Sequence, residues 1–331
     1  MNKSCLIGFL MCSAFSLVVQ AATDGAHITK TISQIERKKG IKRTIQYRPD
    51  GNDFVCVNGK NRYTRALYGG ITDFRIETSD RPVFATYKPK DSKHICFRLQ
   101  CGNQSIALDS LKFCEARYRA GRRTYRLTDP LLGKGELNIS VLAFPDAEGG
   151  IWRFTMKDMP EGALLHCYIS EIRAKNLSRN GDMGADRADS FDAPQLPKEQ
   201  KHYKLSLDGT TAYIVVEDQE LRLPALVEGT SLYDKSEKWR SEIESSLQIS
   251  TPDPYFNPLG GALAAAADGI WDGKIWLHGA IGWRSQLNGW RAAYIGDFIG
   301  WHDRARTHFD SYAASQVTDV PATIPHPTQD T

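Results

Sequence analysis

The sequence has no surplus of charge of either sign. Its 331 residues contain 42 Lys and Arg against 39 Asp and Glu, which gives a net charge of +3. A protein that binds nucleic acid mainly through phosphate contacts needs a large basic face, and this balance argues against one. The Gly-Gly pairs at 69–70, 149–150 and 260–261 belong to no glycine-rich phosphate-binding motif. We therefore expect neither a nucleic-acid partner nor a nucleotide cofactor.

Long apolar runs are also missing, apart from one at the N-terminus. Lys3 precedes an apolar stretch at residues 6–19, which is too short to span a bilayer as a helix. Val19-Gln20-Ala21 follows as a small-x-small cleavage site. Residues 1–21 are therefore predicted to be a signal peptide.

A lipoprotein signal that uses Cys12 is the competing interpretation of the same segment. The bulky Met11 precedes this cysteine where a small residue is expected, so simple cleavage near Ala21 is favoured. We expect a secreted or periplasmic protein with no membrane span.

Cysteine is scarce once the signal peptide is removed. The five that remain are Cys56, Cys96, Cys101, Cys114 and Cys167. They show neither the C-x-x-C nor the Cys/His spacing of a metal site, so no metal is expected. Most lie in alternating apolar runs and are predicted to be buried and unreactive. The sequence does not decide whether Cys96 and Cys101 form a disulfide.

Alternation of apolar and polar residues dominates the first two thirds of the chain. Residues 44–47 and 54–57 flank a Pro-Asp-Gly-Asn turn and predict a hairpin. Many more short strands follow up to residue 217, with few helical patterns between them. The pattern predicts a mainly β fold, an antiparallel β-sandwich over residues 41–230 that follows an N-terminal lead-in at residues 22–40.

From Asp234 the period changes to that of a helix. Trp239, Ile243 and Leu247 recur at i, i+4 and i+8, which predicts one apolar stripe. Three prolines between residues 251 and 258 end this helix. Residues 231–258 are therefore predicted to be a linker helix and a Pro-rich linker.

The last part of the chain is rich in tryptophan, with five of the seven between residues 271 and 301. An Ala-rich helix is predicted over residues 259–270, and a second helix over residues 289–315. Aromatic residues recur every three or four positions along the second helix, which predicts an apolar stripe that packs against a partner. Mid-helix Phe298 and Trp301 are expected in the core.

The segments at residues 267–280 and 289–305 resemble the opening hairpin of a six-hairpin, glycosidase-like α/α toroid. The β-rich region before them resembles the N-terminal domain of a family of uncharacterised secreted bacterial proteins, in which it precedes such toroids. The resemblance implies a secreted carbohydrate-active protein, similar to glycoside hydrolases that act on complex polysaccharides. It identifies residues 259–331 as a partial six-hairpin region and transfers no catalytic residue to this chain.

The residue chemistry of this region also suits a sugar. Pyranose rings stack on indoles through their C–H faces, while their hydroxyls need planar donors and acceptors. Candidate substrate-binding residues with this chemistry are Asp272, Trp276, His278, Trp290 and Arg291. The alternative is that most of these tryptophans are core residues that pack one helix against the next.

Glycoside hydrolysis normally needs two carboxylates about 5–10 Å apart. The carboxylates with aromatic neighbours in the sequence are Asp268, Asp272, Asp297 and Asp303. Each is also the kind of residue that caps a helix or forms an ion pair, so the catalytic residues stay unknown.

The length after Pro258 favours an incomplete toroid. Twelve helices of about 11 residues each would be needed, and residues 259–331 number 73. We expect the N-terminal portion of a longer protein, inactive alone, whose C-terminal catalytic region is missing from this chain and whose partner is a glycan. The alternatives are a non-catalytic carbohydrate-binding protein and a scaffold β-sandwich.

Overall fold

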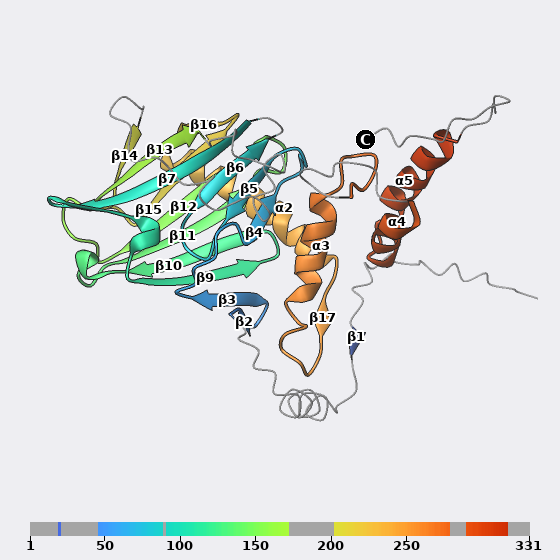
Figure 1. Ribbon diagram of the computed structural model, residues 1–331, viewed down its shortest axis with the longest axis horizontal. Coiled ribbons are helices and arrows are strands. Elements are labelled where there is room, and N and C mark those ends of the chain that lie inside the picture. Colours follow the sequence, from blue (N-terminus) through green and yellow to red (C-terminus); the bar gives the residue numbers. More distant parts are fainter. Residues whose placement is uncertain (1–18, 21–45, 89–90, 172–201, 279–288, 317–331) are drawn as a thin grey trace, which may run out of the picture.

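The computed structural model describes residues 19–20, 46–88, 91–171, 202–278 and 289–316 (Figure 1). Within these ranges, two antiparallel β-sheets pack as a sandwich and are followed by helices. This confirms the predicted mainly β fold. The predicted signal peptide and lead-in lie outside the described residues, except for residues 19–20. No helix in the described ranges is long and apolar enough to cross a membrane.

The first sheet has eight strands in the order β16-β15-β12-β11-β10-β9-β3-β2. In chain order they are β2 Arg48–Asp50, β3 Asp53–Val57, β9 Phe113–Arg119, β10 Arg122–Thr128, β11 Glu136–Ala143, β12 Gly149–Lys157, β15 Thr211–Glu217 and β16 Glu220–Arg222. A hairpin is present as β2–β3, but its first strand is Arg48–Asp50, on part of the predicted turn, and not residues 44–47, of which 44–45 lie outside the described residues. Along β10, Arg123, Tyr125 and Leu127 are buried, while Thr124 and Arg126 point to the outer face.

The second sheet has seven strands, with six in the order β14-β13-β7-β6-β5-β4 and β8 paired to β7. In chain order they are β4 Arg65–Tyr68, β5 Arg75–Thr78, β6 Phe84–Lys88, β7 Asp91–Cys101, β8 Gln104–Ala107, β13 Leu164–Glu171 and β14 His202–Ser206. Short 3₁₀ turns lie at Leu108–Ser110 and Pro130–Leu132. Outside both sheets, β1 (Val19–Gln20) pairs in parallel with β17 (Ile249–Ser250).

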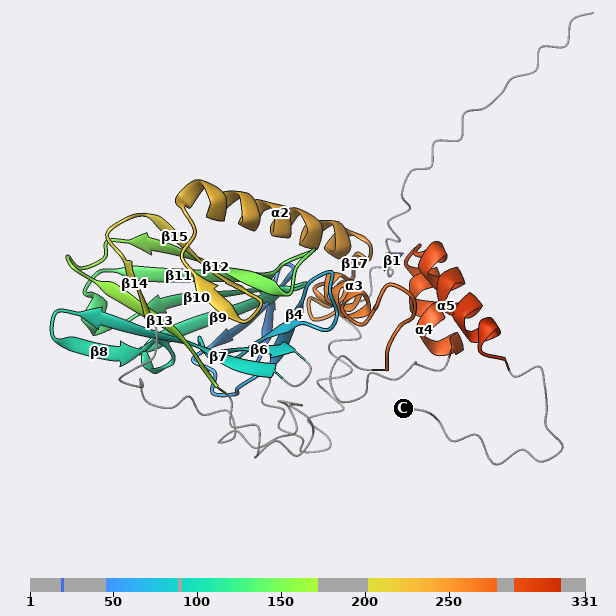
Figure 2. The ribbon, with the colours of Figure 1, turned by 90° about the horizontal axis from the view of Figure 1, so that it is seen from above.

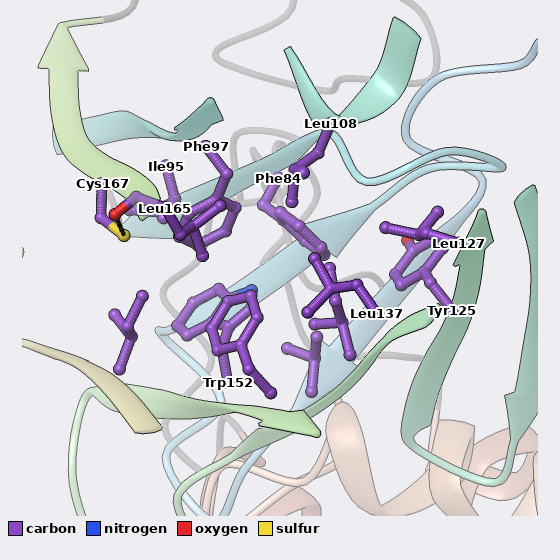
Figure 3. Packing of buried hydrophobic residues seen from close by; sticks show 14 of the residues in the cluster. Phe84, Ile95, Phe97, Leu108, Tyr125, Leu127, Leu137, Trp152, Leu165 and Cys167 are labelled. Carbon is purple, nitrogen blue, oxygen red and sulfur yellow. Dashed lines mark hydrogen bonds between the residues drawn. The ribbon is translucent and has the colours of Figure 1, made fainter. Parts of the chain in front are cut away.

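Aromatic rings from both sheets form the centre of the core (Figure 3). Phe84 of β6 lies edge-on to Trp152 of β12 and to Tyr125 of β10, with ring centroids 5.7 and 5.6 Å apart. Phe97 of β7 packs in the same way on Phe154 of β12, at 5.5 Å. Edge-to-face pairs of this kind are favourable beyond the area they bury, so these rings join the two sheets.

Helix α2 (Leu226–Ser245) lies along the outer face of the eight-stranded sheet (Figure 2). Its buried face contains Gly229, Tyr233, Ser236 and Arg240. The helix begins at Leu226, before residue 231, where the predicted linker helix begins. The predicted stripe is also displaced, because Trp239 is only half-buried while Arg240 is buried. The face of α2 that meets the sheet is polar, because Arg119 and Arg122 of the sheet form ion pairs with Glu244 and Glu237 of the helix. These ion pairs explain why the buried face differs from the predicted apolar stripe.

The C-terminal helices are α3 (Leu259–Gly269), α4 (Gly289–Phe298) and α5 (His302–Ala314). The single helix predicted over residues 289–315 is therefore wrong. It breaks at Gly300, whose φ is +87°. The N–H of Trp301 donates to the Gly296 carbonyl at 2.7 Å, and that of Gly300 to the Asp297 carbonyl at 3.2 Å. These two bonds form a Schellman motif, which ends α4.

The break also splits the predicted aromatic stripe. Phe298 is 59% exposed, which corrects its expected place in the core, and Tyr294 and Phe309 are also exposed. Trp301 is half-buried. Helices α4 and α5 therefore pack on each other but leave large apolar side chains on their surface.

The five cysteines that follow the predicted signal peptide are all free. The Cys96–Cys101 disulfide left open by the sequence is not formed. Both residues lie on β7, where five steps of about 3.3 Å separate them by roughly 16 Å, far beyond the reach of a disulfide. Cys56, Cys114 and Cys167 are buried, as predicted.

Candidate functional site

A cavity of about 220 Å³ lies where the sandwich meets the helices; we call it the junction cavity. Its walls come from β4, the β9–β10 hairpin, the end of β11, α2 and α3. The residues around it are Thr64, Arg65, Ala66, Tyr68, Tyr118, Ala120, Gly121, Leu142, Ala143, Trp239, Arg240, Ile243, Ala265, Ala266 and Asp268. The cavity thus combines three aromatic side chains with two arginines and one carboxylate. Its volume is slightly below the ~300–1,000 Å³ that is usual for drug-sized ligands, so it suits one small ring.

Arg65 is the charged residue of the β4 wall. Its guanidinium carbon lies 5.0 Å from the ring centre of Tyr47 and 5.5 Å from that of Tyr118. Its Nη1 donates to the Thr64 carbonyl at 2.6 Å, and no acidic side chain pairs with it among the described residues. The aromatic rings hold the guanidinium in place, and its remaining N–H groups are available to a ligand.

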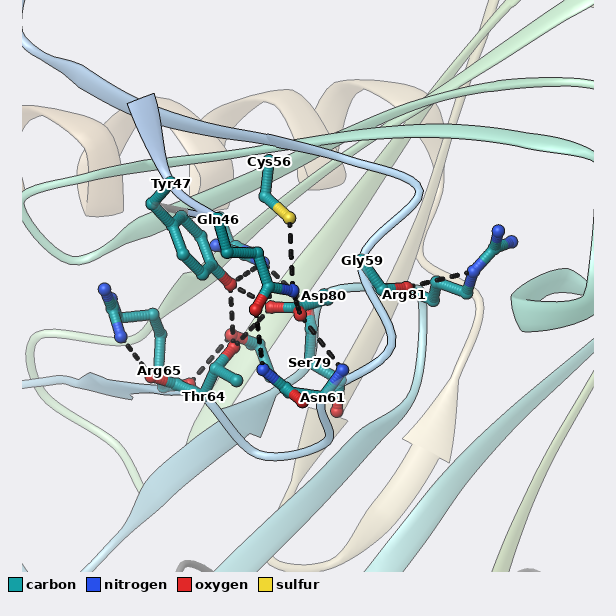
Figure 4. A network of polar contacts seen from close by, with 12 residues as sticks. Gln46, Tyr47, Cys56, Gly59, Asn61, Thr64, Arg65, Ser79, Asp80 and Arg81 are labelled. Atoms are coloured by element: carbon teal, nitrogen blue, oxygen red, sulfur yellow. Dashed lines mark hydrogen bonds and ion pairs between the residues drawn. The ribbon is translucent and has the colours of Figure 1, made fainter. Parts of the chain in front are cut away.

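Behind this wall is a buried polar network centred on Asp80 (Figure 4). Asp80 accepts hydrogen bonds from the hydroxyls of Tyr47 and Thr64 and from the side-chain amide of Gln46. Arg123, which is also fully buried, lies 3.8 Å from the Asp80 carboxylate. Because Thr64 and Tyr47 also contact Arg65, the network fixes the shape of the β4 wall.

At the other side of the cavity, Asp268 lies in the last turn of α3. It is 7% exposed, and its Oδ1 accepts a hydrogen bond from Arg304 of α5 at 2.7 Å. Burial raises the pKa of Asp268, while the Arg304 guanidinium acts in the opposite direction. Arg304 in turn stacks over Trp301, with 4.4 Å between the guanidinium carbon and the ring centre. The carboxylate is therefore oriented from outside the cavity.

Trp276 is a packing residue in this structure. It is fully buried, and its indole N–H donates to the Ala267 carbonyl at 3.0 Å. Its backbone N–H donates to Nδ1 of His308 at 3.0 Å. A side chain at Gly296 would lie 2.1 Å from the indole, so α4 rests directly on the ring. This tryptophan joins α3, α4 and α5 and has no exposed face for a sugar ring.

Two of the other candidate residues, Asp272 and His278, do not line the junction cavity. Asp272 is exposed and accepts hydrogen bonds from the backbone N–H groups of Lys274 and Ile275, so it shapes the turn after α3. His278 is exposed. Trp290 and Arg291 lie in the first turn of α4, and their side chains are outside the described part of the chain. Their binding roles stay predictions.

The remaining carboxylate candidates, Asp297 and Asp303, do not line the junction cavity. Asp297 is exposed and pairs with His302 at 2.7 Å, and Asp303 is exposed in the first turn of α5. Among the described residues that line the junction cavity, Asp268 is the one carboxylate. The described residues also contain no group of three or more His, Cys, Asp or Glu side chains able to hold a metal ion.

The sequence analysis missed most of the junction cavity. Arg65, Tyr118 and Trp239 come from a strand, a hairpin and a helix that are far apart in the chain. In the sequence, none of the three stands out from its neighbours. Alternation and helical periodicity indicate which residues are buried, but they do not indicate which strands and helices pack against each other. Only Asp268, set among aromatic residues in the sequence, was noticed as a candidate.

Residues 89–216 match the family described as "Domain of unknown function (DUF4450)". The chain therefore contains a DUF4450 domain. The matched residues extend from β7 to β15 and include strands of both sheets. Tyr118 lies inside the match, whereas Arg65 and Trp239 lie outside it. No curated protein matches this chain.

Proposed function

We propose that this chain is the glycan-binding N-terminal portion of a secreted carbohydrate-active protein. The observation that carries this proposal is the chemistry of the junction cavity. Tyr68, Tyr118 and Trp239 offer aromatic surface, while Arg65 and Asp268 offer a charged donor and a charged acceptor. This is the combination that the flat C–H faces and the hydroxyls of a sugar ring require.

Binding is favoured over hydrolysis by the number of carboxylates. Two further cavities lie beside the C-terminal end of α2 and on the outer face of the eight-stranded sheet. The described residues that line each of these cavities, and the junction cavity, include one carboxylate. These carboxylates are Glu244, Glu115 and Asp268, respectively. Acid-base cleavage of a glycosidic bond normally uses two.

The helices support the resemblance to an α/α toroid, which is part of the same proposal. Helices α4 and α5 pack on each other and expose Tyr294, Phe298 and Phe309. Exposed aromatic groups of this kind are usual where further elements pack. In the proposed arrangement, such a pair begins a ring of helices beside the sandwich.

A cavity-filling variant tests the glycan-binding role. Ala265→Leu adds three carbon atoms to the α3 wall of the junction cavity. We expect the wild-type chain to bind members of an array of plant and host oligosaccharides, and Ala265→Leu to lower this binding at least about tenfold, as expected for the loss of one stacked and hydrogen-bonded ring. Ala314→Leu makes the same change at an exposed position of α5 and should bind like wild type.

Two results would contradict the proposal. If the wild-type chain binds no oligosaccharide although it is folded, the scaffold alternative is correct. If the purified chain releases sugar from the array glycans, the limitation to binding is wrong.

A further inference from the structure

The outer face of the eight-stranded sheet carries a second cavity, of about 240 Å³, which we call the sheet groove. It crosses β9, β10, β11 and β12 beside α2, and Figure 2 shows the helix lying over this sheet. Strand pairing places its outward side chains in two rows. One row is Glu115, Arg126, Asn138 and Thr155, and the other is Arg117, Thr124, Ser140 and Arg153.

The centre of the groove is hollow because its side chains are short. Thr124 and Ser140 are direct partners in the middle of the second row, between Arg117 and Arg153 at its ends. The hydroxyls of Thr124 and Thr155 make no hydrogen bond to any described residue. The floor of the groove therefore offers hydrogen-bonding groups that a hydroxylated ligand can use.

The arginines of the groove differ in how their charge is neutralised. Arg117 and Arg126 share Glu115, at 2.8 and 3.5 Å. Arg153 makes no ion pair or hydrogen bond to the described residues, and its Nε is buried without a partner. Its guanidinium carbon lies 3.9 Å from the ring centre of Tyr233.

This stacking fixes the position of the Arg153 charge. Tyr233 of α2 is itself held by a hydrogen bond of 2.6 Å to Ser140 in the floor of the groove. A guanidinium that is held flat and lacks a counter-ion favours a planar anion, because its paired N–H groups match the two oxygens of a carboxylate.

We propose that the sheet groove binds a hydroxylated carboxylate of the uronic acid class, with its carboxylate on Arg153 and its hydroxyls on the Thr and Asn side chains of the floor. The proposal deepens the proposed function, on which its choice of a sugar acid rests. It adds a site that is separate from the junction cavity.

Titration calorimetry of the full chain with glucuronate tests the groove, with glucose and sulfate as reference probes. We expect glucuronate to bind more tightly than either probe. Arg153→Gln should weaken glucuronate binding at least about tenfold, as expected for the loss of a charged hydrogen bond. Thr124→Val, which removes one hydroxyl at nearly constant size, should weaken it by a smaller factor. Arg98→Gln, on the outer face of the other sheet, should leave it unchanged.

Three results would overturn the groove proposal. The first is the absence of glucuronate binding to the wild-type chain. The second is equal affinity for sulfate and glucuronate, which would show an anion site without sugar recognition. The third is loss of glucuronate binding in Ala265→Leu but not in Arg153→Gln. In that case the sugar acid binds in the junction cavity, and the proposed function stands without the groove.

Discussion

At the scale of single residues, Arg65 and Arg153 are the side chains on which the two sites depend. Both are half-buried, both stack on tyrosine, and neither has an acidic partner among the described residues. A partly desolvated charge without a counter-ion is costly, and natural proteins usually pair it. Most arginines around them are paired, as Arg117, Arg119 and Arg240 show. The exceptions are therefore the places where a ligand would improve the electrostatics.

The cysteines permit a test at the same scale. Burial raises the pKa of the Cys96 thiol to about 11 and that of Cys114 to about 12, and it raises the pKa of Cys167 further. A thiol with a pKa near 12 is thiolate in about one molecule in ten thousand at pH 8, and the thiolate is the reactive form. In the native protein at pH 8, we expect Cys101, which is only half-buried, to be alkylated by iodoacetamide before the others.

Peptide mass spectrometry after timed alkylation measures this order. Protein unfolded in urea is the control, since all five cysteines should then react at similar rates. Native alkylation of Cys114 or Cys167 at the rate of Cys101 would show that the interior opens far more often than the structure indicates.

At the scale of secondary-structure elements, the sequence predicts an element well only where a local pattern determines its ends. Strands with one buried face were predictable, because alternation reports burial directly, as in β9 and β10. Alternation gives no signal for strand β5, because it is short and both of its faces are buried, including Arg75 and Glu77. The start of α2 was missed because Ala225 at its N-cap offers no side-chain capping bond.

At the end of α4, the sequence contains a helix-ending signal, but a stronger helical pattern conceals it. Gly300 is a standard helix-ending residue, yet the aromatic periodicity continues across it from Phe298 to Trp301 and predicts one long helix. The junction cavity could not be predicted for a different reason. Its walls are set by how α2 and α3 meet the sandwich, and no local pattern encodes that packing.

Gly300 gives a prediction for this element. Its φ of +87° is a conformation that costs other L-residues about 1–2 kcal/mol, and no atom would crowd an added methyl group. We expect Gly300→Ala to lower the free energy of unfolding of the helical region by about that amount, measured by urea denaturation and followed by tryptophan fluorescence.

Gly209 provides a matched control for this variant. It also has open space around its Cα, but its backbone is not in the left-handed region. Gly209→Ala should therefore be neutral or slightly stabilising. Equal effects of the two substitutions would mean that the Schellman motif does not end α4 in solution.

At the scale of the whole molecule, the core is divided into parts that depend on different tryptophans. The large cluster inside the sandwich contains Trp152, and its buried residues all lie between Leu67 and Leu221 in the sequence. A separate small cluster around Trp276 joins the C-terminal helices. Helix α3 connects the parts, because the Gly269 carbonyl accepts a hydrogen bond from Thr72 at 2.6 Å and Gly269 packs on Tyr68.

This division predicts that the two parts can be loosened separately. Trp276→Ala removes the ring on which α3, α4 and α5 meet, a change that typically costs about 3–5 kcal/mol. We expect limited trypsin digestion of this variant to cut α5 at Arg304 and Arg306, while the strands stay protected. Trp152→Ala is the matched control, because Trp152 is equally buried and lies inside the sandwich. It should instead expose sites such as Arg117 and Arg126 on the strands. Cleavage of these strand sites at the same rate in both variants would show that sandwich and helices unfold as one cooperative unit.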